Sequence, residues 1–228
     1  MEWKNPWNKK QLVCLFLIAF AAVPIFIEYL LKNALDLLLG EGMLSAMLMS
    51  IAMAAVFILS LYYIALKPDR LSWREIGISR FAPAYLIQIA GWTVFLIVMT
   101  FAVMEILIWF GAGYENTKTK TITADPSWLS IAMSFASACI VSPIYEELFY
   151  RGFLYRWFRA EFGVVWALVA SSALFMIAHI PTYNTLAVNF GTGLVFAWTY
   201  EKTRSIIPAM IIHSLFNAIL LFFTILLT

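Results

Sequence analysis

The residues of this sequence best suited to chemistry lie within long apolar stretches. Glu146 and Glu147 are adjacent, and Arg151 follows four residues after the second acid. On membrane-insertion scales, a charged side chain at the centre of a membrane helix costs about 2.5 to 3.5 kcal/mol. Each charged residue within an apolar stretch therefore needs an explanation. Glu147 and Arg151 share a helix face and are predicted to form an ion pair. Glu146 points about 100° away and is expected to lack a partner on its own helix, which suits it to act as a general base or acid.

Both histidines of the chain, His179 and His213, also lie on apolar segments. Asn217 follows His213 by one helical turn and presents a second polar group on the same face. Taken singly, a membrane histidine is more often a packing residue, and paired acids can simply mark a helix end. Together these residues indicate a buried catalytic site. Glu146 and His179 lie about equally far from a predicted turn at residues 161–163, so we expect them at the same height in the bundle.

The composition places this site in a membrane protein. The sequence is 63% hydrophobic and only 12% charged, whereas soluble chains contain about 25% charged residues. Its formal net charge of +2 comes from few, balanced charges, which excludes a nucleic-acid partner. Cys14 and Cys139 both fall in apolar runs and predict no disulfide.

Hydropathy predicts the fold class, an all-α polytopic membrane bundle of about seven helices in one domain spanning residues 1–228. Residues 1–127 hold three helices without motifs, and residues 128–228 form a catalytic core of four. The predicted spans are residues 11–33, 43–66, 82–111, 128–150, 163–180, 184–200 and 205–227. In the sixth of these, Gly191 and Gly193 are expected to permit close helix packing.

The basic residues predict the orientation. With a cytoplasmic N-terminus, twelve of the 15 lysines and arginines fall on the inner side, in accord with the positive-inside rule. The inner residues are Lys4, Lys9, Lys10, Lys67, Arg70, Arg74, Arg80, Arg151, Arg156, Arg159, Lys202 and Arg204, and the outer ones are Lys32, Lys118 and Lys120.

The motifs form a recognisable set. Glu146-Glu147-x-x-x-Arg151, Phe175-x-x-x-His179 and His213-x-x-x-Asn217 together resemble those of the CPBP family of intramembrane proteases. That family includes the type II CAAX prenyl endopeptidases and the Abi proteins, which are associated with bacteriocin processing or self-immunity. Phe190-x-x-Gly193 is similar to a weaker motif of the same family.

The resemblance implies an intramembrane endopeptidase that acts on membrane-associated peptides or proteins, including lipidated or leader-bearing ones. Glu146, assisted by His179, would activate water, while His213 and Asn217 would stabilise the oxyanion and Glu147 with Arg151 would hold the site in register. No cofactor is needed in this preferred mechanism. A second mechanism uses Zn²⁺ bound by Glu146, His179 and His213.

Other functions remain possible at this point. A chain with the same motifs could serve without proteolysis, as a bacteriocin self-immunity protein or a membrane scaffold. A transporter with a proton relay is disfavoured, because the sequence shows neither polar residues spread over many helices nor internal repeat symmetry.

Overall fold

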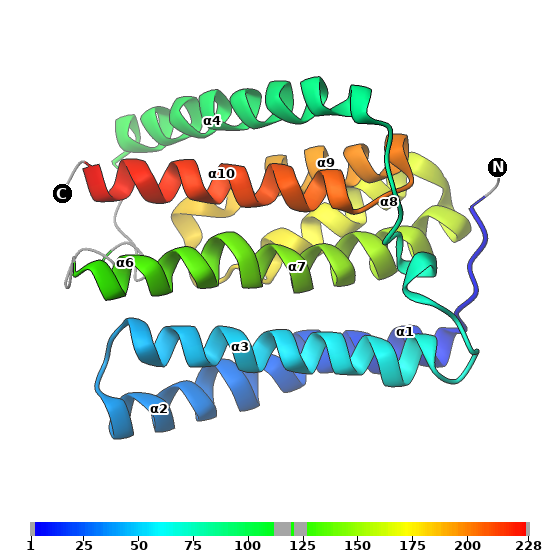
Figure 1. Cartoon of the computed structure of the whole chain (residues 1–228), viewed down its shortest axis with the longest axis horizontal. Helices are drawn as coiled ribbons and strands as arrows, with labels where there is room; N and C mark the ends of the chain where they lie inside the picture. The colour runs from blue at the N-terminus through cyan, green and yellow to red at the C-terminus, as the bar shows by residue number, and fades with distance from the viewer. Residues whose placement is uncertain (1–2, 112–119, 121–126, 227–228) are drawn as a thin grey trace.

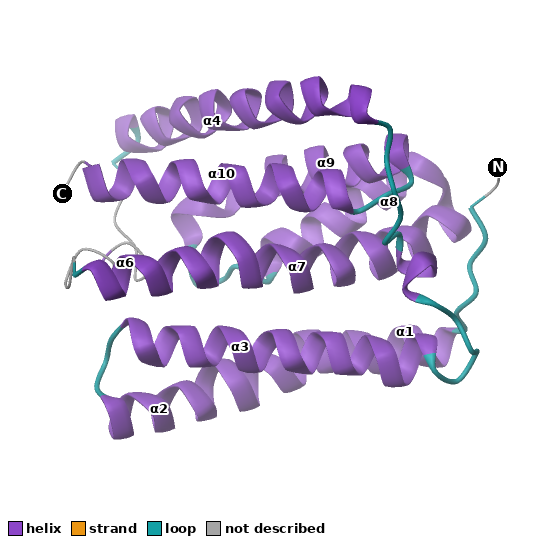
Figure 2. Ribbon diagram, viewed as in Figure 1, coloured by secondary structure: helices purple, strands orange, loops and turns teal. Residues whose placement is uncertain are grey.

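The computed structural model describes residues 3–111, 120 and 127–226. Within these residues every regular element is a helix (Figure 2). The prediction of an all-α membrane bundle is therefore confirmed. Lys118, one of the predicted outer residues, lies outside the described part of the chain.

Several helical segments join end to end into long rods. The first rod is Lys9–Leu39, the second is Met43–Leu66, the third is Pro83–Trp109 and the fourth is Trp128–Ile177. The N-terminal part consists of α1 (Lys9–Leu17), η1 (Ile18–Leu31), α2 (Lys32–Leu39), α3 (Met43–Ser60), η2 (Leu61–Leu66), η3 (Trp73–Ile76), η4 (Pro83–Tyr85) and α4 (Leu86–Trp109). The C-terminal part consists of α6 (Trp128–Phe135), η5 (Ala136–Val141), α7 (Ser142–Glu146), η6 (Glu147–Tyr155), α8 (Arg156–Ile177), η7 (Tyr183–Thr185), α9 (Leu186–Thr203) and α10 (Ile207–Leu226).

The first rod begins at a capping box. The Asn8 side chain accepts hydrogen bonds from the backbone of Lys10 and Gln11, and the Gln11 side chain accepts one from the Asn8 backbone. These bonds satisfy N–H groups that the first helical turn leaves without partners. The Gln11 amide also donates to the Ile64 carbonyl at 2.9 Å, which ties the start of α1 to the end of the second rod.

The fourth rod contains the chain reversal predicted at residues 161–163. Gly163 has φ 81° and ψ 178°, a backbone conformation that is not helical, so α8 is divided at this residue. Glycine adopts a positive φ at no steric cost, which explains why the break falls there. The second half of α8 returns along η6, and Phe175 packs edge to face against Tyr150 with ring centroids 5.2 Å apart.

The rods lie roughly parallel in the bundle (Figure 1). The pair formed by α1–α2 and α3 occupies one side, and α3 contacts α6, η5 and α7. On the other side α10 contacts both α4 and α9, and α9 packs on α8. The elements α7, η6, α8 and α10, which carry the predicted site residues, thus lie between the N-terminal pair and α4.

Five helices in the described residues are long and apolar enough to cross a membrane, so the chain is a multi-pass integral membrane protein. They are Lys9–Leu39, Met43–Leu66, Pro83–Trp109, Trp128–Ile177 and Ile207–Leu226. The predicted count of seven is not confirmed. Trp128–Ile177, which Gly163 divides, covers two predicted spans, and α9 does not qualify.

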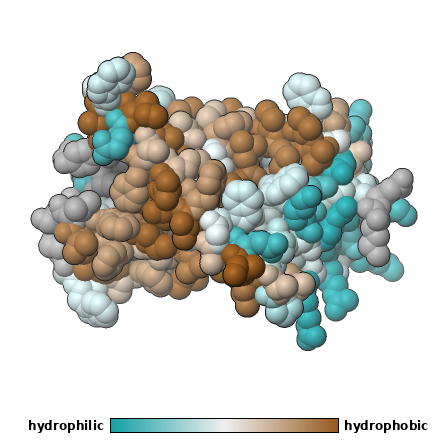
Figure 3. All heavy atoms as spheres, turned by 90° about the horizontal axis from the view of Figure 1, so that it is seen from above, coloured by the Kyte–Doolittle hydropathy of each residue, from teal (hydrophilic) through white to brown (hydrophobic). Residues whose placement is uncertain are grey.

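Hydrophilic side chains gather at the end of the molecule where the N-terminus lies, and apolar side chains cover much of the middle of the face seen in Figure 3. At the hydrophilic end Arg156 contacts the Lys4 carbonyl at 3.3 Å and forms an ion pair with Glu75 at 2.8 Å. Lys4 and Arg156 belong to the twelve basic residues predicted on the cytoplasmic side. That this end faces the cytoplasm stays a prediction.

Candidate active site

The centre of the site is a buried ion pair that also holds a histidine. Arg151 Nη1 donates to Glu147 Oε1 at 2.9 Å, and the His213 Nδ1 atom lies 2.9 Å from the same oxygen. The side chains of Glu147 and Arg151 are completely buried, and that of His213 is 6% exposed. The predicted ion pair is therefore present. Because a carboxylate oxygen only accepts, the His213 proton facing it must be on Nδ1.

Glu146 lies beside this pair, directly before Glu147 on the same rod. Its Oε2 atom is 3.8 Å from His213 Nε2, too far for a direct hydrogen bond. Ser142, one helical turn earlier, donates its hydroxyl to Glu146 Oε1. The expectation that Glu146 lacks a partner on its own helix is thus wrong. That expectation took account only of charged residues that follow Glu146, whereas the partner is a hydroxyl four residues before it.

Two phenylalanines enclose the charged groups. The Phe196 ring stacks on His213 with centroids 4.7 Å apart and an interplanar angle of 21°. The guanidinium carbon of Arg151 lies 4.4 Å from the Phe175 ring centre and 5.0 Å from that of Phe196. Aromatic faces attract a cation electrostatically, and more strongly when water is excluded. The two rings therefore compensate part of the cost of burying Arg151.

His179 joins the cluster through Phe175. Its Nδ1 atom lies 2.7 Å from the Phe175 carbonyl oxygen, and the two rings are 4.7 Å apart. A carbonyl can only accept, so Nδ1 carries the proton and Nε2 is the atom able to accept another. Phe175 also meets His213 edge to face at 6.0 Å. One aromatic ring thus contacts both imidazoles.

Asn217 of α10 contacts the same rod that carries Glu146. Its amide nitrogen donates to the Ala138 carbonyl at 2.7 Å, which links α10 to η5. An amide has two N–H groups, so this bond uses one of them.

Gly193 lets α9 approach the site closely, as predicted. A Cβ atom there would come within 2.9 Å of the Ser172 side chain and 3.1 Å of its Cα, and its carbonyl accepts from Arg151 Nη2 at 3.3 Å. For Gly191 the neighbour is the sulfur of Met99, at 2.8 Å from the added atom. Both contacts support the predicted role of these glycines in packing.

No group of three or more His, Cys, Asp or Glu side chains in the described residues is arranged to hold a metal ion. The zinc site predicted from Glu146, His179 and His213 therefore stays a prediction.

Comparison with known families finds similarity in the part of the chain that carries the candidate site. Residues 127–219 match the family model described as "Type II CAAX prenyl endopeptidase Rce1-like". This segment, less than half of the chain, is thus similar to the Rce1-like family. The match begins at the start of α6 and ends inside α10, so it contains all six predicted site residues.

A curated relative is similar over a shorter stretch. The UPF0177 protein YaiH of Lactococcus lactis subsp. lactis (strain IL1403) is 30% identical over 88 residues, which is 39% of this chain and 36% of that protein. The chain thus aligns with about a third of the relative's length. No solved structure matches. Neither match supports a role in bacteriocin immunity.

Sequence reasoning missed two contributors to the candidate site. Ser142 holds Glu146, and Phe196 covers His213 and Arg151. Ser142 could have been found, because a hydroxyl four residues before a buried acid faces it on a helix. Phe196 could not, since one phenylalanine among 19 gives no signal without the packing of α9 against α10.

Proposed function

We propose that this chain is an intramembrane endopeptidase of the CAAX protease type, which hydrolyses peptide bonds with water activated by Glu146. The observation that carries the proposal is the meeting of two acids from one rod with an imidazole from another, all buried. His213 is hydrogen-bonded to Glu147 at 2.9 Å and lies 3.8 Å from Glu146. The Rce1-like match over the same residues supports it. A purely structural ion pair would not need the additional acid and imidazole.

The separation of Glu146 and His213 suits a reacting water. With Oε2 and Nε2 3.8 Å apart, a water molecule about 2.8 Å from each atom would hydrogen-bond to both. Such a water would be held by a carboxylate able to take its proton and oriented by the imidazole. This is the arrangement that a general-base mechanism requires.

In the proposed reaction, Glu146 accepts a proton from the water while the water oxygen attacks the scissile carbonyl carbon. The carbonyl π-electron pair moves to oxygen and forms a tetrahedral oxyanion. When the C–N bond breaks, Glu146 returns the proton to the leaving amine, so the products are a carboxylic acid and an amine and the enzyme is restored.

Glu147 and Arg151 act in this scheme by positioning His213. A carboxylate bound to Nδ1 fixes the orientation of the ring and stabilises the imidazolium form, in which Nε2–H can donate to the oxyanion. Arg151 and its two phenylalanines keep Glu147 in place. His179 assists proton transfer through Nε2, and the second N–H of Asn217 is the other proposed oxyanion donor.

The substrate class follows from where the site lies. Glu146 and His213 belong to two of the five long apolar helices, so a substrate must reach them from within or beside the bilayer. A peptide tethered by a lipid or by an apolar segment satisfies this condition. We therefore propose membrane-anchored peptides, lipidated or leader-bearing, as the substrates.

The test is comparative proteomics of membrane and released peptides from cells that carry the wild type, Glu146→Gln or Glu105→Gln. Glu105 lies in α4 and is exposed, so its substitution makes the same chemical change outside the site. We expect cleavage products that depend on the wild type, disappear with Glu146→Gln and persist with Glu105→Gln. Products that persist with Glu146→Gln at normal protein level would refute Glu146 as the base.

The metal-free mechanism needs its own test. Protein purified without added metal is analysed for zinc, and the products are measured again after treatment with a strong chelator. We expect no stoichiometric zinc and unchanged cleavage. Zinc at one equivalent, lost together with activity in His179→Ala, would replace this mechanism with the zinc-dependent one.

A further inference from the structure

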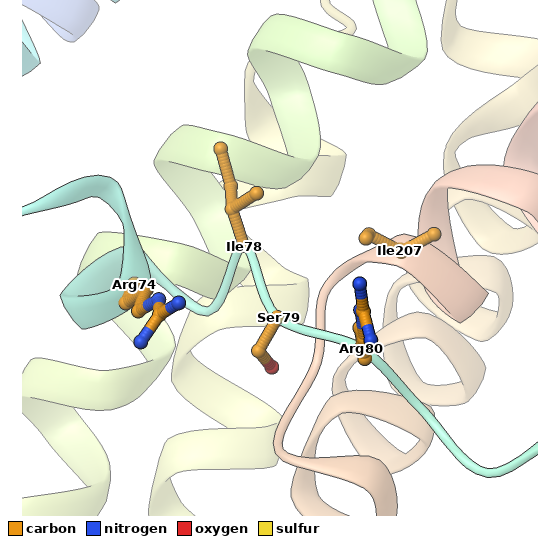
Figure 4. A pocket seen from close by; sticks show the side chains of 5 residues that line it. All are labelled: Arg74, Ile78, Ser79, Arg80 and Ile207. Atoms are coloured by element: carbon orange, nitrogen blue, oxygen red, sulfur yellow. The ribbon is translucent and has the colours of Figure 1, made fainter.

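A second feature of the molecule lies away from the candidate active site, in the loop between η3 and η4. A pocket of about 490 Å³ is lined by Arg74, Ile78, Ser79, Arg80 and Ile207. Figure 4 shows the two arginines on either side of Ser79, with Ile207 of α10 beside Arg80. The volume is within the usual range of small-molecule sites. None of the six predicted site residues lines it.

The two arginines give the pocket an uncompensated positive charge. Arg74 and Arg80 are both exposed, and neither forms an ion pair within the described part of the chain. Two acids of this end, Glu75 and Glu201, already pair with other arginines, Glu75 with Arg156 at 2.8 Å and Glu201 with Arg159 at 3.1 Å. The pocket therefore favours an anion.

The wall of the pocket is held rigidly. The Ile206 backbone donates to the Gly77 carbonyl at 3.0 Å, and the Ser205 hydroxyl donates to the Ser79 carbonyl at 2.6 Å. Gly77 has φ 92°, and a Cβ atom there would come within 2.6 Å of the Tyr200 ring. The loop is thus fixed against α9 and the start of α10 before any ligand arrives, which lowers the entropic cost of binding.

The position of the pocket indicates what kind of anion it meets. Arg80 comes three residues before Pro83, where a candidate membrane span begins, and Ile207 is the first residue of another. The pocket therefore lies at the level where two spans enter the bilayer. Its lining combines two guanidinium groups with the apolar side chains of Ile78 and Ile207. This combination suits a ligand with an anionic head joined to an apolar body.

The geometry points to a binding site for the phosphate head group of an anionic glycerophospholipid. Arg74 and Arg80 bind the phosphate from two sides, and the isoleucines contact the glycerol and the first methylenes of the acyl chains. Arginine suits this role because its planar guanidinium presents several donors to phosphate oxygens. A lipid bound there would fix the η3–η4 loop against α10, the helix that carries His213.

The experiment is native mass spectrometry of the purified full chain in a neutral detergent, titrated separately with phosphatidylglycerol, phosphatidylcholine and inorganic phosphate. The test variant is Arg74→Gln with Arg80→Gln. The matched control is Lys9→Gln with Lys10→Gln, which removes two exposed charges from the start of α1. All four side chains are exposed, so each variant is expected to keep the wild-type unfolding temperature, which is measured in parallel.

We expect the wild type and the lysine variant to bind one phosphatidylglycerol with equal affinity, and the arginine variant to bind it about 20- to 30-fold more weakly. Phosphatidylcholine and inorganic phosphate should bind all three proteins weakly. Wild-type affinity in the arginine variant, or an equal loss in the lysine variant, would overturn the site. Inorganic phosphate that binds as tightly as the lipid would show a soluble anion to be the ligand and would overturn the lipid assignment.

Discussion

The N-terminal helices α1–α4 and the C-terminal helices α6–α10 use polar residues in opposite ways. In the N-terminal part Lys32 and Asp36 form an ion pair at i and i+4 whose side chains are 27% and 19% exposed. In the C-terminal part Glu147 and Arg151 form a pair at the same spacing with no exposure at all. Burying charges costs several kcal/mol per ion. The buried charges of the C-terminal part are therefore better explained by function than by stability.

The apolar residues show the same contrast. In α2, Leu37 and Leu38 are 88% and 80% exposed, as suits side chains that face lipid. In the C-terminal part Phe175 and Phe196 are almost completely buried around Arg151. The N-terminal part therefore fits a lipid-facing role, while the C-terminal part builds a closed polar interior. The family match over residues 127–219 covers this interior.

The largest effect on stability should come from breaking the buried ion pair. Arg151→Met leaves Glu147 as an uncompensated buried charge, and we expect it to lower the free energy of unfolding by about 3–5 kcal/mol. Lys32→Met, at the same spacing in the partly exposed Lys32–Asp36 pair, should cost about 1 kcal/mol or less. The measurement is reversible unfolding in mixed micelles. Equal losses in the two variants would remove the contrast between the two parts.

Glycine-to-alanine substitutions, one in each part of the chain, should give the next largest difference in stability. Gly152→Ala places a Cβ atom 2.0 Å from the Ile76 side chain and 2.6 Å from the Ile76 carbonyl. We expect a loss of about 1–3 kcal/mol, because one of these neighbours is backbone and cannot give way. Gly91→Ala, in α4, meets nothing within 4 Å and should stabilise the helix by up to about 1 kcal/mol. A neutral Gly152→Ala would show that η3 does not pack on η6 as described.

Two serines, Ser142 and Ser45, each donate a hydrogen bond to a carboxylate, but only Ser142 lies at the candidate active site. Ser142→Ala removes the hydroxyl that holds Glu146, and we expect kcat to fall about tenfold with little change in KM. Ser45→Ala removes a hydroxyl bonded to Asp36 at 2.5 Å in the N-terminal part and should leave kcat unchanged. The measurement is steady-state cleavage in proteoliposomes, which gives kcat and KM for both variants. If Ser142→Ala raises KM alone, Ser142 contributes to substrate binding and does not position the base.

The smallest effects should come from shortening apolar side chains. Leu37→Ala in α2 should change the free energy of unfolding by no more than about 0.5 kcal/mol, because its side chain touches little protein. Ile212→Val, a fully buried position in α10, should cost about 0.5–1.5 kcal/mol although it removes only one methylene group. Unfolding in the same micelles compares them. A greater loss for Leu37→Ala would mean that α2 packs on protein in the membrane.

Much of the fold could be predicted from sequence because membrane helices are specified locally, by long apolar runs and a few breaks. Gly163 is one example, since a charged and glycine-containing stretch between apolar runs indicated the reversal that the structure contains. The number of crossings was harder to predict. The α9 segment, Leu186–Thr203, mixes apolar residues with Glu201 and Lys202, so its composition does not decide whether it spans the bilayer.

The site was predictable where its contacts lie within one helix and unpredictable where they join different helices. The Glu147–Arg151 pair followed from its spacing, and the Ser142–Glu146 contact has the same spacing. That His213 would bind Glu147, and that Asn217 would bind the Ala138 carbonyl, depends on how α10 lies against the fourth rod. Spacing along the chain contains no information on that arrangement.

In the proposed mechanism Glu147 and His213 act as one unit with Glu146 in peptide hydrolysis. A double-mutant cycle measures this directly, with cleavage rates of the wild type, Glu147→Gln, His213→Gln and the double variant in proteoliposomes. We predict that each single substitution lowers the rate about 100-fold or more, and that the double variant is no slower than the worse single one. Rate losses that multiply in the double variant would show that Glu147 and His213 act independently. A wild-type rate in either single variant would show that this residue is not needed for hydrolysis.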